Sequence, residues 1–275
     1  MPKLAANLTL LFTELPFLDR FDAAARAGFK AVEVQFPYEY EVAQIASALA
    51  AAELDLVLHN LPAGDWSAGD RGLACDPARK AEFRAGVSTA IGYATALGCP
   101  LLNCLAGRRP PAVEPALARR TLIENLSFVV EELAATGIRL VLEHVNSKDV
   151  PGFFVDRPSL AIAVMDEVGS PDLKLQFDIY HAQVMEGDLS RALASLMPRI
   201  GHVQIADNPG RHEPGTGEIN FRYLFRRLDE LGYDGWVGCE YVPQGKTVAG
   251  LGWIASTLEV EGSKTTPSLS QAIAR

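Results

Sequence analysis

Short apolar runs recur along the chain, and each is followed by a longer segment whose apolar positions are spaced as in a helix. The runs are rich in Val, Ile and Leu and are bounded by Gly and Pro, which is typical of parallel strands buried on both faces. The eight runs are LAANLTLL (4–11), KAVEVQF (30–36), LDLVLHN (54–60), PLLNCLA (100–106), IRLVLEHVN (138–146), LKLQFDIYH (173–181), IGHVQIA (200–206) and GWVGCEY (235–241). The pattern therefore predicts eight strands that alternate with helices.

Eight strand–helix units in one chain predict an α/β fold, a single (β/α)8 TIM barrel. The barrel is expected over residues 1–260, with its last helix at 248–260, and the polar segment 261–275 is expected to form a C-terminal tail. An open, doubly wound sheet is the main alternative, but no Gly-x-Gly-x-x-Gly phosphate turn follows the first run. In a TIM barrel the active site lies at the carboxyl ends of the strands.

Each of the last four runs carries a polar residue near its carboxyl end: Glu143, Asp178, Gln204 and Glu240. Consecutive strands of a closed barrel would place these side chains around one mouth. A lone glutamate at a strand end is usually solvated or paired, but four polar residues at matching positions are harder to attribute to chance. Carboxylates packed together repel unless a cation neutralises them. Three carboxylates and one amide oxygen favour Mg²⁺ or Mn²⁺ over zinc, so the four are candidate metal ligands.

Four further residues are candidates for binding a substrate. His59 ends the third run and is expected to face the same mouth, unless it is a satisfied core histidine. His181 follows Asp178 by three residues and could reach a substrate oxygen, with a structural hydrogen bond as the alternative. Arg71 lies in a glycine-rich loop, where its two-pronged guanidinium could clamp a carboxylate or be solvated. Arg211, in the loop after the seventh run, is expected to make a structural ion pair or a substrate contact.

Composition and charge exclude several classes of protein. The chain has 275 residues, of which 48% are hydrophobic and 21% charged, as in an ordinary globular protein. Its formal net charge of −9 does not attract nucleic acid or anionic membranes. No apolar run reaches the roughly 18 residues that a membrane span needs, and the N-terminus lacks the pattern of a secretory signal. A cytoplasmic protein is therefore expected, and the sequence leaves open whether it forms a homo-oligomer.

Six segments are the most distinctive in the chain: GDWSAGDRGLA (64–74), ALGCPLLN (96–103), LVLEHVN (140–146), LQFDIYH (175–181), GHVQIADNPGRHEPGTGEINF (201–221) and LGYDGWVGCEY (231–241). Through them the sequence resembles the hydroxypyruvate isomerase family. This family is a branch of the xylose isomerase-like sugar isomerase and epimerase barrels, and it includes the 2-oxo-tetronate isomerases. The resemblance covers roughly residues 1–258, and the segment 201–221 is its most specific part.

The resemblance implies that Glu143, Asp178, Gln204 and Glu240 hold a divalent metal, and that Glu143 and Glu240 also act as the acid/base pair. Related ketose 3-epimerases carry His where Gln204 stands, so the glutamine points to the hydroxypyruvate and 2-oxo-tetronate isomerase branch. Family members commonly read Tyr-Lys-Pro after the eighth strand, whereas this chain reads YVP (241–243). Substrate recognition in that part therefore departs from the family pattern.

The implied reaction interconverts hydroxypyruvate and 2-hydroxy-3-oxopropanoate (tartronate semialdehyde), so the expected partner is a small sugar acid or 2-oxo acid. A metal would make the carbon-bound proton of the α-hydroxycarbonyl removable, and the two glutamates would move protons through an enediolate. A 2-oxo-tetronate (C4 sugar acid) isomerase and a ketose 3-epimerase would use the same groups on larger substrates. A non-catalytic sugar-acid binding protein is the alternative from a different class. A nuclease like endonuclease IV needs a histidine-rich zinc cluster, which five histidines and a net charge of −9 fit poorly.

Overall fold

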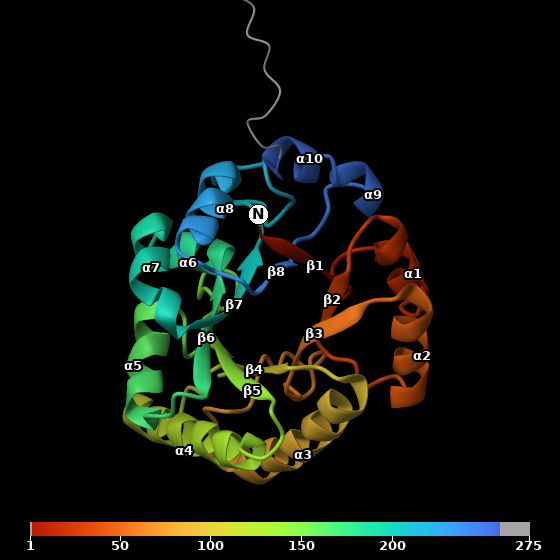
Figure 1. The fold of residues 1–275 in the computed structure, drawn as a ribbon. Coiled ribbons are helices and arrows are strands. Elements are labelled where there is room, and N and C mark those ends of the chain that lie inside the picture. The colour runs from red at the N-terminus through yellow and green to blue at the C-terminus, as the bar shows by residue number, and fades with distance from the viewer. Residues whose placement is uncertain (1, 259–275) are drawn as a thin grey trace, which may run out of the picture.

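Eight parallel strands close into a barrel in chain order, with β1 paired to both β2 and β8 (Figure 1). The structure is a computed structural model that describes residues 2–258. The strands are β1 (Lys3–Asn7), β2 (Ala31–Val34), β3 (Asp55–Asn60), β4 (Leu101–Leu105), β5 (Arg139–Glu143), β6 (Leu173–Asp178), β7 (Ile200–Ile205) and β8 (Trp236–Cys239). The (β/α)8 TIM barrel expected from the sequence is confirmed.

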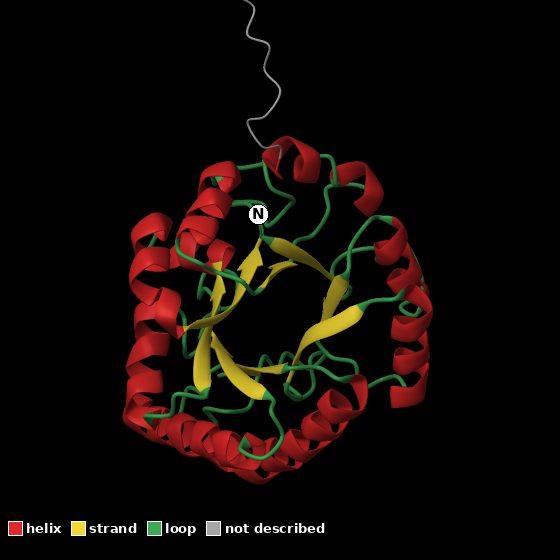
Figure 2. Cartoon of the chain, in the orientation of Figure 1, coloured by secondary structure: helices red, strands yellow, loops and turns green. Residues whose placement is uncertain are grey.

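Helices form a ring around the barrel (Figure 2). They are α1 (Asp19–Arg26), α2 (Val42–Ala52), α3 (Lys80–Leu97), α4 (Pro115–Leu133), α5 (Pro158–Val168), α6 (Ile179–Met185), α7 (Leu189–Leu196), α8 (Phe221–Glu230), α9 (Thr247–Gly250) and α10 (Trp253–Leu258). The buried residues Leu224 and Leu228 of α8 show the four-residue spacing that places one helical face on the barrel. No helix within residues 2–258 is both long enough and apolar enough to cross a membrane.

Strand periodicity divides the barrel interior into an apolar part and a polar part. Alternate residues of a strand point to the same face, so a step of two residues stays inside the barrel. On four strands this step replaces an apolar residue with a polar one: Ala5 with Asn7, Ala31 with Glu33, Leu101 with Asn103 and Val141 with Glu143. The four apolar residues belong to one buried cluster of strand residues. On these four strands the polar side chains therefore lie toward the carboxyl end of the barrel.

The first strand ends earlier than the apolar run 4–11 suggests. It stops at Asn7, because the backbone amides of Leu10 and Leu11 bond to the Asn7 carbonyl at 3.2 and 2.8 Å and turn the chain. Leu8 and Leu11 are still buried, but they belong to the packing around the barrel rather than to the strand. Apolar composition alone therefore extended the predicted strand by four residues.

The sixth strand is also shorter than its apolar run, 173–181. It stops at Asp178, whose Oδ1 accepts hydrogen bonds from the backbone amides of Tyr180 and His181. This carboxylate is the N-cap of α6, so the last three residues of the run are helical. Asp178 therefore has two functions, because it ends the strand and places its other oxygen at the barrel mouth.

The last helix is not the continuous one expected at 248–260. Two short helices, α9 and α10, are separated by a turn at Leu251 and Gly252. Glycines at 250 and 252 explain the break, because glycine is unfavourable inside a helix. Residues 259–260 and the expected tail, 261–275, lie outside the described residues.

Two glycines allow the loops after β3 and β4 to touch through their backbones. Gly72 and Gly107 have positive φ angles of 118° and 90°. A Cβ atom on Gly107 would lie 2.1 Å from the carbonyl oxygen of Gly72, and one on Gly72 would lie 2.4 Å from that of Leu105. The loop that carries Trp66 and Arg71 is thereby held against the end of β4.

We expect Gly107→Ala to lower the free energy of unfolding by at least about 2 kcal/mol, because it adds a backbone clash to a φ angle that alanine rarely adopts. Chemical denaturation monitored by circular dichroism measures the change. Gly92→Ala is the matched control: Gly92 is an exposed residue of α3 with open space at its Cβ position, and the change should stabilise by roughly 0.5–1 kcal/mol. A loss below about 0.5 kcal/mol at position 107 would contradict the close contact.

Candidate active site

A cavity of about 250 Å³ opens at the carboxyl ends of the strands. It is lined on one side by apolar and aromatic groups, including Trp66 and Phe153. Its polar wall contains Asn60, Arg71, Glu143, His181, Arg211 and Glu240. Acidic, cationic and neutral hydrogen-bonding groups therefore share one small space, as a site for a small polar ligand requires.

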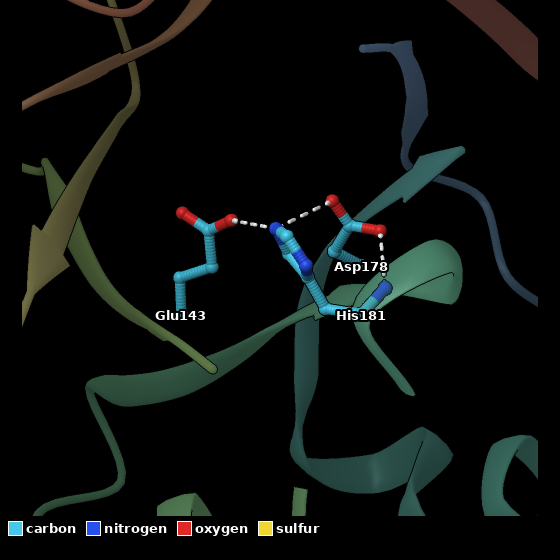
Figure 3. Close-up of side chains that lie close together, drawn as sticks. All are labelled: Glu143, Asp178 and His181. Carbon is cyan, nitrogen blue, oxygen red and sulfur yellow. Dashed lines mark hydrogen bonds and ion pairs between the residues drawn. The ribbon is translucent and has the colours of Figure 1, made fainter. Parts of the chain in front are cut away.

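The ring of His181 lies between the carboxylates of Glu143 and Asp178 (Figure 3). Its Nε2 atom is 4.0 Å from Glu143 Oε1 and 3.7 Å from Asp178 Oδ2. One donor atom from each of the three residues lies within 4.8 Å of the others, so the group could hold a metal ion. The structure thus brings together Glu143 and Asp178, two of the four ligands predicted from the sequence, at the ends of β5 and β6.

The hydrogen-bond network assigns the ring proton of His181 to Nε2. Asn146 Oδ1 accepts bonds from the backbone amides of Lys148 and Asp149, so Asn146 Nδ2 is the atom that faces His181 Nδ1, at 2.7 Å. Because the amide nitrogen donates, Nδ1 accepts and the proton lies on Nε2. Burial lowers the pKa of His181 well below its usual range, so the ring is neutral. His181 is therefore arranged as a hydrogen-bond donor beside the carboxylates, and not as a metal ligand.

Glu143 is a buried carboxylate with a single hydrogen-bond donor among the described residues. Asn103 Nδ2 donates to Glu143 Oε2 at 2.6 Å, while Oε1 faces His181. Burial, followed by the charges of Glu240 and Asp178, raises the pKa of Glu143 well above its ordinary value. Glu143 consequently retains a proton more readily than an ordinary glutamate.

Glu240 directly follows β8 and accepts hydrogen bonds from three donors. Asn7 Nδ2 and Gln35 Nε2 lie 3.1 and 2.7 Å from its Oε1, and Arg211 Nη2 lies 2.8 Å from its Oε2. Burial raises the pKa of Glu240 to about 7, and the charge of Arg211 opposes the rise. Of the two glutamates, Glu240 is therefore the one whose ionised form is better stabilised.

Gln204 pairs with Asp178 in strand register, but its side chain lies beneath the cavity and does not line it. Its Nε2 donates to Glu33 Oε1 at 2.7 Å, and its Oε1 accepts from Gln176 Nε2 at 2.6 Å. An amide oxygen has two lone pairs, so one is left for another partner. The role of Gln204 as a metal ligand remains a prediction.

The chemistry of the donors suits a hard cation. Asp178 Oδ2 is buried and has no hydrogen-bond partner within residues 2–258. Burial raises the pKa of Asp178, and Arg211 and two backbone amides oppose the rise. A divalent cation among Glu143, Asp178 and Glu240 would remove both the repulsion and the unpaired oxygen. The residues present therefore fit a divalent metal.

Arg211 provides a positive charge that acts on Glu143, Asp178 and Glu240. It pairs with Glu240, so the ion pair expected as one alternative for this residue is found. Its guanidinium also lies 5.5 Å from the centre of the Tyr180 ring. Its Nε is buried and has no partner within the described part of the chain, so this donor can bind a ligand. The substrate contact stays a prediction.

Arg71 lines the cavity, as its place in the glycine-rich loop suggested, but the loop itself holds its guanidinium. The guanidinium lies 4.0 Å from the centre of the Trp66 ring. Its Nη1 donates to the carbonyl oxygens of Trp66 and Asp70, at 3.0 and 2.6 Å. A role for Arg71 as a carboxylate clamp remains a prediction.

His59 does not face the mouth, which corrects the orientation expected for it. It is in register with Leu102, a residue of the core around the barrel. Its Nδ1 lies 3.2 Å from the hydroxyl of Tyr38, and it is not part of the cavity wall. The next residue, Asn60, lines the cavity instead. Because strand residues alternate between faces, an error of one position selects the wrong side.

Several polar residues of the site were not recognised as such in the sequence, among them Asn7, Gln35 and Asn60. Asn7 and Gln35 hold Glu240, while Gln35 and Asn60 line the cavity. A signal for Gln35 existed, because it follows Glu33 by two residues and so lies on the same face of the chain. For Asn7 the signal was hidden, because the first apolar run continues past it.

Comparison with known proteins shows that the chain is similar to isomerases. A family model described as xylose isomerase-like TIM barrel matches residues 21–257. Hydroxypyruvate isomerase of Escherichia coli (strain K12) is 49% identical over 254 residues, which cover 92% of this chain and 98% of that protein. The 2-oxo-tetronate isomerase of Cupriavidus necator is 47% identical over the same length, with the same coverage.

Solved structures agree with the family match. A crystal structure described as AP endonuclease, family 2, from Brucella melitensis superposes with a TM-score of 0.91 at 44% identity, over 93% of this chain and 99% of that one. The apo form of 3-keto-D-glucoside 4-epimerase from E. coli, with a TM-score of 0.77 over 93% and 100% of the two chains, is 20% identical and shows the shared fold alone. The chain belongs to the xylose isomerase-like TIM barrel family.

Proposed function

We propose that the protein is a metal-dependent isomerase that interconverts hydroxypyruvate and 2-hydroxy-3-oxopropanoate. The observation that carries this proposal is that two carboxylates, Glu143 and Glu240, line one cavity beside the unpaired oxygen of Asp178. Relatives named hydroxypyruvate isomerase and 2-oxo-tetronate isomerase, at 49% and 47% identity, support a small 2-oxo acid as the substrate. The C4 acid is the alternative substrate, because it presents the same α-hydroxycarbonyl group.

Glu143, Asp178, Gln204 and Glu240 would hold the metal, and their oxygen donors favour Mg²⁺ or Mn²⁺. When bound, such a cation polarises the substrate carbonyl and stabilises negative charge on the oxygens of an enediolate. Proton transfer is the task of the protein side chains.

Glu143 and Glu240 differ in the number of their hydrogen-bond donors, and this difference gives them different roles in proton transfer. Glu240, with three donors, is stabilised as a carboxylate and takes the proton from the carbon beside the carbonyl group. Glu143, with its raised pKa, retains a proton and delivers it to the adjacent carbon, while the hydroxyl proton of the substrate passes to the former carbonyl oxygen. The two roles exchange in the reverse direction, as general acid–base catalysis requires.

Two donors in the cavity wall suit the remaining substrate oxygens. Arg211 has an unpaired Nε, which together with the guanidinium charge suits the carboxylate of a 2-oxo acid. The Nε2–H group of His181 lies beside Glu143 and can donate to a hydroxyl or carbonyl oxygen. The carboxylate and the reacting carbons would thus be bound by different residues.

A nuclease activity, for which the Brucella protein is named, is less well supported here. Within residues 2–258, the group of acidic, cysteine and histidine side chains close enough to share a metal is Glu143, Asp178 and His181. It contains one histidine, and the net charge of −9 opposes the approach of a nucleic acid. A small anionic substrate needs only the local positive charge that Arg211 supplies.

Metal-dependent exchange of the substrate α-proton tests the proposal directly. In D₂O with Mg²⁺ or Mn²⁺, NMR should show deuterium entering hydroxypyruvate. After chelation of the metal, deuterium should enter more slowly. Glu143→Gln and Glu240→Gln should each lower kcat by about 10²–10⁴-fold, because each removes one proton-transfer group. A panel of C3 and C4 oxo acids and C6 ketoses identifies the substrate. Unchanged exchange after chelation and in Glu240→Gln would exclude the mechanism.

The raised pKa of Glu240 predicts how the stability of the chelated protein depends on pH. A carboxyl group whose pKa rises on folding, here from 4.5 to about 7, stabilises fully below about pH 4.5, and the contribution is lost as pH rises through about 7. Glutamine at position 240 cannot ionise. The melting temperature of Glu240→Gln, relative to that of the wild type, should therefore rise as pH increases from about 5 to about 8. Differential scanning fluorimetry measures the melting temperatures of both proteins. A difference between them that stays constant with pH would show that Glu240 does not titrate in this range.

Arg211→Met should raise the KM for hydroxypyruvate by about 10–100-fold, the cost of a charge-assisted hydrogen bond to the substrate carboxylate. Steady-state kinetics measures this, and α-proton exchange of dihydroxyacetone, which lacks a carboxylate, measures how much of the effect comes through Glu240. Arg109→Met is the control, because Arg109 bonds to the Val113 carbonyl and does not line the cavity. Equal losses with both compounds would rule out a carboxylate clamp.

A further inference from the structure

Glu33 is a buried carboxylate that the proposed proton transfers do not use. It lies inside the barrel on β2, is 0% exposed and does not line the cavity. Its Oε1 accepts hydrogen bonds from Asn7 Nδ2 at 2.8 Å and Gln204 Nε2 at 2.7 Å, and its Oε2 lies 2.7 Å from His202 Nε2. Burying a carboxylate is costly, so its presence beneath the active site calls for a function.

Strand β8, which only β1 separates from β2, is shaped to admit this carboxylate. A Cβ atom on Gly238 of β8 would lie 2.2–2.5 Å from the carboxyl atoms of Glu33. Because Gly238 has no side chain, Glu33 can extend from β2 to the residues of β7. The space that a barrel would ordinarily fill with an apolar side chain is here occupied by a carboxylate.

In the hydrogen bond between Glu33 and Gln204, Gln204 is the donor and Glu33 is the acceptor. A carboxylate oxygen accepts hydrogen bonds, and any proton that Glu33 shares with His202 lies on the other oxygen, Oε2. Oε1 therefore accepts in either protonation state, and the group of Gln204 that faces it must be the amide nitrogen. The amide oxygen of Gln204 is consequently held on the side away from Glu33, where one of its two lone pairs accepts from Gln176 Nε2 at 2.6 Å and the other is left for a cation.

The contact with Asn7 links the same carboxylate to Glu240. Asn7 Nδ2 donates both of its hydrogens, one to Glu33 Oε1 and one to Glu240 Oε1. Its Oδ1 accepts from the backbone amide of Thr9 at 3.0 Å, which fixes the orientation of the side chain. Glu33 thus contacts one candidate metal ligand directly and reaches a second through Asn7.

We propose that Glu33 is a positioning residue: it holds the Gln204 side-chain amide so that the oxygen, and not the nitrogen, is available to a divalent cation. An inverted amide would present N–H groups, which cannot bind a metal. This inference rests on the proposed function, because it assumes that Gln204 is a metal ligand.

Mn²⁺ titrations of the full-length, metal-stripped protein by isothermal titration calorimetry test the inference. Glu33→Met removes the acceptor, and we expect Mn²⁺ affinity to fall by about 10–100-fold, as for other residues that orient a metal ligand. Glu33→Gln keeps an oxygen for Gln204 and turns its NH₂ group to His202, so its affinity should stay within about threefold of the wild type. In a Gln204→Met background, Glu33→Met should change affinity by less than about twofold, because the group that Glu33 orients is gone.

Each result decides the question. Equal Mn²⁺ affinity for Glu33→Met and the wild type, equal losses in Glu33→Met and Glu33→Gln, or a loss that persists without Gln204 would overturn the inference. If Glu33→Met does not fold, Glu33→Ala, which also removes the acceptor, replaces it with the same expectations.

The failure of this inference and that of the proposed function are distinguishable. A wild-type protein that binds Mn²⁺ and needs it for isomerisation, with Glu33→Met unaltered in affinity, contradicts the role of Glu33 alone. A wild-type protein that neither binds Mn²⁺ nor loses activity on chelation contradicts the proposed function itself.

Discussion

Carboxylates buried close together at one end of a barrel are the constraint on which the rest of this structure depends. Glu33, Glu143, Asp178 and Glu240 are almost fully buried, so protein donors must replace water around them. Side-chain amides make more than half of the hydrogen bonds to these carboxylates, and they add no positive charge. The site thereby keeps the negative potential that attracts a divalent cation. The amides that do this are Asn7, Gln35, Asn103 and Gln204.

The barrel and its loops contribute different parts of the charge pattern. The strands and their ends supply the carboxylates and the amides, whose positions are set by strand register. The loops supply the cationic side chains, Arg71 and Arg211, each of which is held by contacts within the loops or with an adjacent aromatic ring. A substrate with a carboxylate and an α-hydroxycarbonyl group would meet the loop cations with one end and the barrel acids with the other.

The barrel and much of the acidic cluster could be predicted from sequence, because both follow from where apolar runs end. Glu143 and Asp178 end strands, Glu240 follows one, and the structure brings the three together. The prediction for His59 was wrong because successive strand residues point to opposite faces. An error of one position along the strand therefore places a side chain on the wrong face. Asn7 was missed because its strand ends in a backbone turn that apolar composition does not reveal. The network beneath the cavity was beyond sequence reasoning, since its partners come from strands far apart in the chain.

The shared space of Glu33 and Gly238 couples the two positions. A carboxylate at 33, held where it is, has room only while position 238 has no side chain, because a Cβ atom at 238 would collide with it. The glycine could therefore be replaced only once the acid is lost.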